Sequence, residues 1–470
     1  MSINSQADLP ASTKGKPAEP MAVYSRATSL PSILVPINLL PTEILSHILI
    51  FSALPSPCIS IKSVGHNLHP LVVIPSVCTT WRRLALSLGL LWSHVDVDEW
   101  YTKIDRGALW LNRTKLWLER AGGAPINFHF QDELPEGRRT LDEDVDPQLY
   151  NVLLPHISRA ISSTFARDVK QILTQDLLNF YAVCCPPKQL RVLSITATSC
   201  YFLPKPDRFV WPTRDLRDLT VLELTHLYEF FCPSLDVLIL MLSSSPGLHT
   251  LRILNANVAG RPYSDLPEIR LPNLKYIELA PIADFSITFR LLRAIVPGNC
   301  ALHVQAWPLP ESDNKDSLSA LAAFLRRSKV VYLHLSEAGT GTSVLSPKVF
   351  EIFESVPQLQ FLSLRLAEDD SCRLLTALVG TPEGKNPYTK CTSLRTLHLE
   401  RTVINQLVWG RIQEVVETHQ LKKVIIGSQV TGLDDIIELG QVTRLHWLRK
   451  RVGQVVYSDQ AQFPISEDLG

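Results

Sequence analysis

A six-residue aliphatic pattern, L-x-x-L-x-L, recurs from residue 190 onward in this chain of 470 residues. Its copies, some with Ile or Val for Leu, start at Leu190, Leu219, Leu248, Leu274, Val330, Leu359, Leu394 and Leu421, with a weaker copy at Asn299. Successive copies start about 25 to 35 residues apart. Repeats of this length indicate a solenoid, because one unit cannot bury its apolar face alone and must stack on its neighbours.

The segments between the copies have the apolar spacing of helices, as in residues 234–242 and 317–325. Each repeat therefore predicts a strand followed by a helix, which makes the fold class α/β with parallel strands. Alternating apolar residues predict two earlier strands of the same sheet, at Val95–Val97 and Ile126–Phe130. Residues 131–189 are mostly helical in pattern and contain no clear strand copy, so they cannot be phased.

The residues before these strands predict a small helical module. Pro41 suits the first position of a helix, and Ile44, Leu45, Ile48 and Leu49 then form one apolar stripe. After a proline-containing spacer, a second helical stretch is predicted, and Leu91-Trp92 ends the module with an apolar anchor.

The sequence divides into six segments. They are a disordered tail (1–36), the helical module (37–95), the entry to the solenoid (96–189), the irregular repeats (190–430), a C-terminal cap (431–455) and a flexible tail (456–470).

The module resembles the F-box family through Leu40-Pro41-x-Glu43-Ile44-Leu45-x-x-Ile48, then Val77-Cys78-x-x-Trp81-Arg82-x-Leu84 and Leu91-Trp92. The resemblance covers about residues 39 to 92 and implies a helical bundle that docks onto the Skp adaptor of a Skp-cullin-F-box ubiquitin ligase. The positions that match the docking surface are Leu40, Pro41, Ile44, Leu45, Ile48, Val77, Cys78 and Trp81.

The sequence departs from the family pattern in one place. The spacer between the two motifs is longer than in a compact F-box, because Pro55 to His69 stands as an insertion. The alternative is that the same apolar residues form only the core of an N-terminal cap on the solenoid. Both alternatives bury Trp81, and they differ in whether Pro41, Ile44 and Ile48 stay exposed.

The following segment is similar to fungal F-box-like proteins that end in irregular leucine-rich repeats. The similarity is carried by Leu91-Trp92-x-x-Val95-x-Val97 and by Trp117-Leu-Glu-Arg-Ala-Gly-Gly-Ala-Pro-Ile126. Regular leucine-rich repeats carry Asn or Cys three residues after the last leucine. This chain instead carries Thr198, Leu227, Ala256, Ile282, Ala367 and Thr402 there, which predicts a less regular curvature.

Strand geometry predicts where a target protein would bind. The third, fifth and seventh residues of each copy should point away from the helices, onto the concave face of the sheet. The predicted target-binding residues on that face are Arg252, Tyr276, Glu278, Tyr332, His334, Phe361, Arg365 and His398, accompanied by Thr250, His303 and Glu400. Aromatic and Arg side chains dominate the energetics of many interfaces, but these residues could equally serve only to cover the sheet.

Composition and motifs exclude several other classes of function. Lys+Arg and Asp+Glu both number 46, so no net charge draws the chain to nucleic acid or to a membrane surface. The N-terminus lacks the pattern of a secretory signal, and nine scattered cysteines favour reduced thiols, which together predict a cytoplasmic or nuclear protein. No phosphate loop, nucleophile elbow or zinc-protease motif is present, which indicates a protein that is not an enzyme and needs no cofactor.

A metal site is not predicted either. His303, His334 and His398 share the middle variable position of a copy, but His398 lies two repeats beyond His334, so no third ligand completes a site. The sequence therefore favours a non-catalytic substrate receptor that couples a captured protein to a ubiquitin ligase. The alternative is an interaction scaffold without ligase coupling.

Overall fold

A computed structural model describes residues 37–53, 70–98, 107–131, 147–166, 171–184, 189–196, 210–212, 216–227, 231–256, 258, 266–280, 285–306, 315–336, 349–365, 368–379, 391–400, 404–427 and 444–458. The predicted tail 1–36, the spacer Pro55 to His69 and residues 459–470 lie outside these ranges, as do Thr198, Ile282, Ala367 and Thr402.

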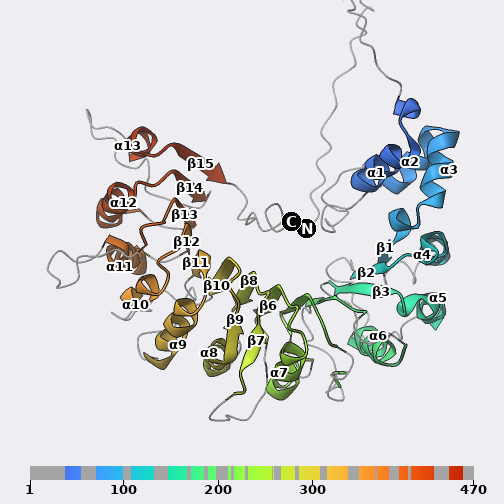
Figure 1. Ribbon diagram of the computed structural model, residues 1–470, viewed down its shortest axis with the longest axis horizontal. Coiled ribbons are helices and arrows are strands. Elements are labelled where there is room, and N and C mark those ends of the chain that lie inside the picture. Colours follow the sequence, from blue (N-terminus) through green and yellow to red (C-terminus); the bar gives the residue numbers. More distant parts are fainter. Residues whose placement is uncertain are drawn as a thin grey trace, which may run out of the picture.

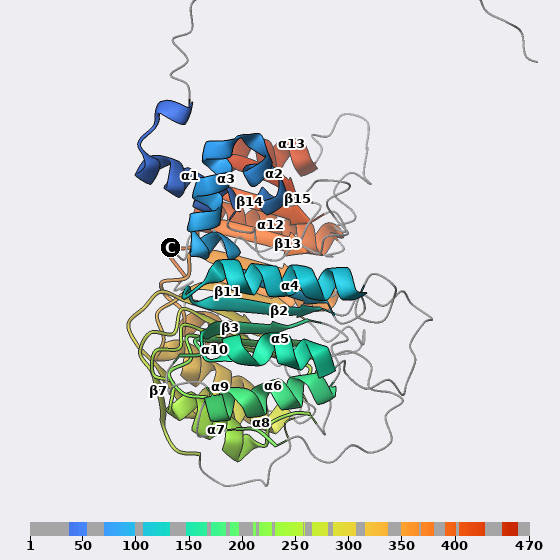
Figure 2. The same cartoon turned by 90° about the vertical axis from the view of Figure 1, so that its right-hand side faces the viewer.

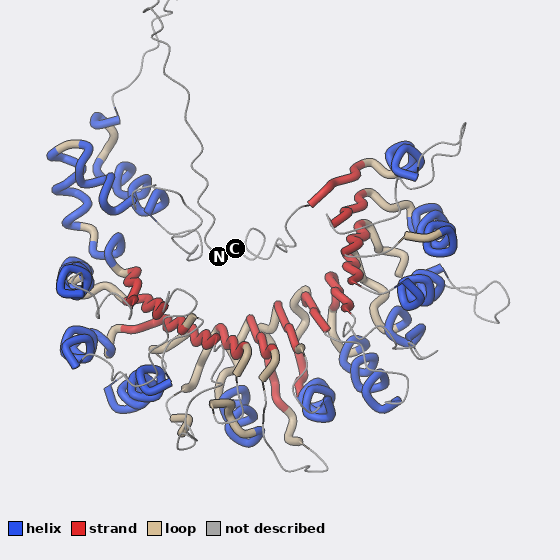
Figure 3. Tube along the Cα trace, turned by 180° about the vertical axis from the view of Figure 1, so that it is seen from behind, coloured by secondary structure: helices blue, strands red, loops and turns tan. Residues whose placement is uncertain are grey.

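A 13-stranded parallel sheet extends from His94 to Ser458, in the order β1-β2-β3-β4-β5-β6-β8-β10-β11-β12-β13-β14-β15. The strands line the inner side of an arc and the helices cover its outer side (Figures 1 and 3). The strands are β1 (His94–Asp98), β2 (Ile126–Gln131), β3 (Ala160–Phe165), β4 (Val192–Thr196), β5 (Val221–Thr225), β6 (Thr250–Leu254), β8 (Tyr276–Leu279), β10 (Leu302–Ala306), β11 (Val330–Ser336), β12 (Phe361–Arg365), β13 (Thr396–Glu400), β14 (Lys423–Gly427) and β15 (Gln454–Ser458). The predicted α/β solenoid architecture is therefore confirmed at this level.

Helices follow most of the strands, as the repeat pattern predicts, but the described residues contain none between β4 and β5 or between β6 and β8. Beyond the N-terminal module they are α4 (Gly107–Ala121), α5 (Pro147–Ile157), α6 (Gln171–Cys184), α7 (Leu235–Ser243), α8 (Phe285–Ala294), α9 (Lys315–Arg326), α10 (Val349–Glu354), α11 (Glu368–Val379), α12 (Gln406–His419) and α13 (Arg444–Arg451). Figure 2 shows α4, α5 and α6 stacked one after another along the outer side. A two-stranded sheet, β7 (Ile269–Leu271) with β9 (Ile295–Pro297), is an addition that the pattern did not predict.

The leucine positions of the copies form one continuous core. Leu222 aligns with Leu251 and Leu251 with Ile277, and all three side chains are buried. Because side chains alternate along a strand, every second residue packs against the helices and the residues between them face the inner side. Of the unusual residues at the expected Asn position, Leu227 and Ala256 are buried and apolar, so packing takes the place of a side-chain hydrogen bond there.

The pattern assigned the wrong register to the weaker copy that starts at Asn299. Val304 pairs with Ile277 on one side and Leu333 on the other, so it occupies the position that the pattern gave to Leu302. Leu302 pairs with Val330, and the register shifts immediately after it. The strand is one residue short between these two apolar positions, which a search for a fixed six-residue spacing could not detect.

The boundaries of two segments also needed correction. Residues 131–189, in which no strand was found, contain β3 between α5 and α6, with Ala160 and Phe165 buried. The polar run Ser162-Ser163-Thr164 hides this strand from an aliphatic pattern. At the other end, β15 continues to Ser458 and pairs with β14, so the flexible tail was placed too early at residue 456.

The N-terminal module comprises η1 (Ile37–Leu39), α1 (Thr42–Ala53), α2 (Pro70–Val77), α3 (Thr79–Ser87) and η3 (Gly89–Trp92). Its core contains Leu45, Leu49 and Trp92 together with Trp117 from α4. The indole rings of Trp92 and Trp117 meet edge to face, with centroids 6.1 Å apart. The module therefore shares its core with α4, the first helix of the solenoid.

Candidate functional site

Two apolar stripes run along α1, and only one of them is covered. Leu45 and Leu49 point into the module core. Ile44 and Phe51 are seven residues apart, two helical turns, so they lie on the same side of the helix in the other stripe. Their exposed fractions are 49% and 74%. Ile48 lies between them and is half-buried. On α2, Val73 and Val77 are also exposed. A helix with apolar residues on an uncovered side is typical of a docking surface.

This concentration distinguishes the module from the rest of the described chain. Thirteen large apolar side chains are exposed in the described residues, and eight of them belong to residues 37–92. They are Ile37, Leu39, Ile44, Phe51, Val73, Val77, Leu86 and Leu90. A module that only capped the solenoid would gain nothing from these exposed side chains, because apolar surface left in contact with water does not stabilise the fold.

The eight predicted adaptor-binding residues do not all lie on that surface. Pro41, Ile44 and Val77 are exposed, and Leu40, Ile48, Cys78 and Trp81 are half-buried. The prediction that Leu45 belongs to the docking surface is wrong, because its side chain is buried within the module.

Cys78 also has a structural part to play, since its Sγ accepts a hydrogen bond from the backbone N–H of Trp81 at 3.4 Å. It is therefore the N-cap of α3.

The inner face of the sheet carries a row of polar side chains, one from each of the eight consecutive strands from β4 to β13. Because neighbouring strands are in register, the row runs across the sheet through Ser194, Glu223, Arg252, Glu278, Gln305, His334, Ser363 and His398, and we call it the polar ladder. Gln305 stands in this row, and His303 instead pairs with Tyr276 and Tyr332 in the row beside it. The prediction that His303 and His334 share a row was therefore wrong.

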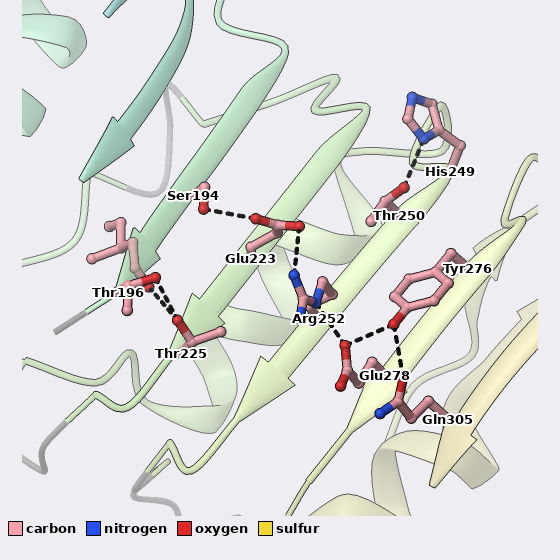
Figure 4. Close-up of polar contacts among 11 residues, drawn as sticks. Ser194, Thr196, Glu223, Thr225, His249, Thr250, Arg252, Tyr276, Glu278 and Gln305 are labelled. Atoms are coloured by element: carbon pink, nitrogen blue, oxygen red, sulfur yellow. Dashed lines mark hydrogen bonds and ion pairs between the residues drawn. The ribbon is translucent and has the colours of Figure 1, made fainter. Parts of the chain in front are cut away.

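Arg252 links the first half of the polar ladder (Figure 4). Its Nε donates to Glu278 Oε2 at 2.6 Å, and its Nη1 lies 3.4 Å from Glu223 Oε1. Tyr276 donates its hydroxyl to the same Glu278 oxygen at 2.7 Å. Burial alone would lower the pKa of Arg252, but Glu278 and Glu223 together raise it above its ordinary value. The Arg252 guanidinium thus neutralises two carboxylates within the sheet face.

Histidines form the second half of the polar ladder. The Oγ of Ser363 lies 2.9 Å from His334 Nδ1 and 3.2 Å from His398 Nδ1. Glu400 Oε1 lies 3.3 Å from His398 Nδ1. Burial lowers the pKa of His398 to about 4 in spite of this carboxylate, and burial, with His398 and Arg365 nearby, lowers the pKa of His334 to about 3. Both rings are therefore neutral at pH 7.

Ser363, His398 and Glu400 contain the residue types of a hydrolytic triad, but their geometry does not fit one. Both Ser363 and Glu400 approach the same nitrogen, Nδ1 of His398. A triad needs the serine on one ring nitrogen and the carboxylate on the other. Ser363 is also fully buried, so a substrate cannot reach its hydroxyl.

Most of the predicted target-binding residues are buried rather than exposed. Tyr276, Glu278, Tyr332, His334 and His398 each have 7% or less of their surface exposed. They contact one another and their ladder neighbours, which is the alternative that the sequence left open for this face. The predicted residues that remain partly accessible are Arg252, Phe361 and Arg365. Phe361 stacks on Tyr332 with ring centroids 4.5 Å apart.

A third group of side chains was missed by sequence reasoning. His94 and Asp96 on β1 lie beside His129 on β2, and their potential ligand atoms all lie within 4.8 Å of one another. The rings of His94 and His129 have centroids 4.1 Å apart. Burial, and then the neighbouring His94, lower the pKa of His129 to about 4. The signal was present in the alternation His-Val-Asp-Val, but a motif search along one segment cannot find ligands on two strands.

The two buried cysteines, Cys232 and Cys391, do not have the properties of a nucleophile. Burial raises the pKa of both Cys232 and Cys391 to about 12, so each remains a thiol at neutral pH. A reactive cysteine needs a lowered thiol pKa and access to solvent.

Comparisons with protein-family models and with curated proteins found no match to this chain. Among the described helices, none has the length and apolar character needed to cross a bilayer.

Proposed function

We propose that the protein is a non-catalytic substrate receptor, in which the N-terminal module docks onto the Skp adaptor of a cullin-containing ubiquitin ligase and the solenoid captures the target. The observation that carries the proposal is the uncovered apolar stripe of α1, made of Ile44, Ile48 and Phe51. This stripe coincides with the F-box-like motif, in which Pro41, Ile44 and Ile48 match the family's docking positions.

The arrangement of the elements also suits a receptor. The module is anchored to α4 through the contact of Trp92 with Trp117, so a partner bound to α1 would be held at a fixed distance from the solenoid. The inner face of the solenoid offers Arg252, Phe361 and Arg365 as accessible contacts for a target protein. These residues belong to β6 and β12, which are separated by several strands of the sheet.

The test is direct binding of the full-length chain to the purified Skp adaptor. Ile44→Ala should weaken the complex at least tenfold, which is about 1.4 kcal/mol, because a central apolar anchor is removed from the interface. Leu240→Ala is the matched control: Leu240 lies on α7 and its exposed fraction is also 49%. Both substitutions affect exposed side chains, so neither should change the melting temperature by more than a few degrees.

The outcome separates the proposal from the alternative. If the unmodified chain does not bind the adaptor at micromolar concentrations, ligase coupling is refuted and an interaction scaffold explains the fold. Equal loss of affinity in both variants would show that the stripe on α1 is not the docking surface.

A further inference from the structure

The N-terminal edge of the sheet brings two imidazoles and one carboxylate together. His94 and Asp96 are two residues apart on β1, so they project from the same face of the strand. Asp96 pairs in register with His129 on β2. Val95 and Val97 on β1, and Phe128 on β2, are buried against the helices. The three polar residues therefore lie on the inner face.

Their spacing matches that of ligands around a single metal ion. His94 Nε2 lies 3.4 Å from Asp96 Oδ1. Bonds of about 2.0 to 2.2 Å in a tetrahedral zinc site place two ligand atoms about 3.3 Å apart. All three donor atoms already lie within 4.8 Å of one another, so small rotations of the side chains would complete the set. The exposed fractions of the His94 and Asp96 side chains are 17% and 24%, so an ion can enter from solvent.

We propose that His94, Asp96 and His129 form a binding site for a divalent metal ion of the zinc class. Two imidazole nitrogens favour zinc and similar transition metals, whereas calcium and magnesium prefer sites built from oxygen. Three protein ligands would leave one position of a tetrahedral ion for water or for a carboxylate of a bound protein.

The site has a structural consequence of its own. Among the described strands, β1 is at the edge of the sheet and pairs with β2 alone. A metal ion held by both strands would fasten this edge strand and, through η3 directly before it, the position of the helical module. Metal binding should therefore stabilise the folded chain, since a ligand that binds only the folded state raises its stability. This inference does not depend on the proposed ligase coupling.

The experiment is a Co²⁺ titration of the full-length, chelator-treated protein, followed by visible absorption and then by competition with Zn²⁺. One equivalent should bind, without the intense near-ultraviolet band of thiolate ligands. His94→Ala and His129→Ala should each weaken binding at least tenfold. The matched control is His303→Ala, which removes a histidine from the same face but from a distant strand, and it should bind as the unmodified chain does.

A second measurement keeps the test decisive if an alanine variant does not fold. Asp96→Asn keeps the size of the side chain but removes its charge, and it should also weaken Co²⁺ binding at least tenfold. In parallel, Zn²⁺ should raise the melting temperature of the unmodified chain relative to chelator, and Asp96→Asn should lose that increase. Equal affinity in Asp96→Asn and the unmodified chain, or a thiolate band in the Co²⁺ spectrum, would overturn the proposal.

Discussion

Arg252 Nε lies 2.6 Å from Glu278 Oε2, on neighbouring strands of the inner face. Glu278 has only 4% of its surface exposed, so its carboxylate depends on this guanidinium and on the Tyr276 hydroxyl for its hydrogen bonds. The pair gives Arg252 a structural part besides any contact with a target protein. Replacing Arg252 should therefore lower the stability of the fold as well as any affinity for a target protein.

Arg252→Ala should lower the free energy of unfolding by about 2 to 3 kcal/mol, because a buried carboxylate loses its charged partner. We place the loss below that of a fully buried pair, since the Arg252 side chain is 35% exposed and partly screened by solvent. Urea denaturation measures the difference. The control is Arg270→Ala: Arg270 Nε lies 2.7 Å from Glu268 Oε1, but its side chain is 79% exposed. Similar losses in both variants would contradict this prediction.

Acid should destabilise the protein through the two buried histidines. His334 and His398 have pKa values of about 3 and about 4 in the folded chain, below the ordinary value of 6.5. The unfolded chain therefore takes up protons at a higher pH than the folded chain, so stability is complete above about pH 6.5 and falls as pH is lowered toward 4. Glu400 and Arg365 are the charged groups beside them.

Melting temperatures between pH 7.5 and pH 4.5 test this expectation. His334→Gln keeps a polar side chain beside Ser363 but cannot titrate, and it should flatten the decline between pH 6.5 and 4.5 relative to the unmodified chain. His226→Gln serves as the control, because it replaces a histidine outside the polar ladder. An unchanged slope in His334→Gln would show that other groups govern the acid response.

Truncation at residue 95 should destabilise the module rather than release an independent domain. The cut removes Trp117, whose ring packs edge to face on Trp92 and which belongs to the module core. A fragment of residues 36–95 should therefore show little cooperative thermal unfolding, whereas a fragment of residues 36–131 should retain more helical structure. Circular dichroism compares the two, and equal cooperativity in both would show that Trp117 is dispensable to the module.

Gly89 tests the same junction within the full chain. A side-chain carbon at this position would lie 2.6 Å from the backbone oxygen of Ala121, at the end of α4. Because the obstacle is backbone, Gly89→Ala should lower the free energy of unfolding by about 1 to 3 kcal/mol, as for overpacking in a core. Gly410→Ala, where nothing lies within 4 Å of an added carbon, should instead be neutral or raise stability by up to about 1 kcal/mol, because Gly410 lies within α12 and Ala favours a helix more than Gly does. A neutral Gly89→Ala would mean that α4 can shift away from the module.

Substitutions of Cys78 test its role as the N-cap of α3. Its Sγ accepts a hydrogen bond from the Trp81 N–H, and serine is a better acceptor at an N-cap. Cys78→Ser should therefore keep or raise stability, by up to about 1 kcal/mol, whereas Cys78→Val should lower it by a similar amount. Chemical denaturation gives both values, and equal stability of the two variants would exclude the cap as a significant interaction.

The sequence alone determined the strands and helices of the repeats, because alternation along a strand and the spacing of apolar residues along a helix are local properties. In the copies at Leu219, Leu248 and Leu359, the residues that the pattern assigns to the core are buried in the structure. Prediction from the sequence failed where the local pattern is weak. β3 was missed because its central residues are serine and threonine, and β10 was placed in the wrong register because it is one residue short before Val304.

Only the tertiary structure determined which side chains are neighbours and which are exposed. Whether Ile44 or Leu45 faces outward depends on the contacts that α1 makes with α2, α3 and η3, because both residues are equally apolar. His94 and His129 are far apart in sequence and meet only because β1 and β2 pair in register. Likewise, Glu278 and His334 are polar residues at predicted surface positions, and they are buried because each strand of the ladder supplies hydrogen-bonding partners to the next, which no single repeat can reveal.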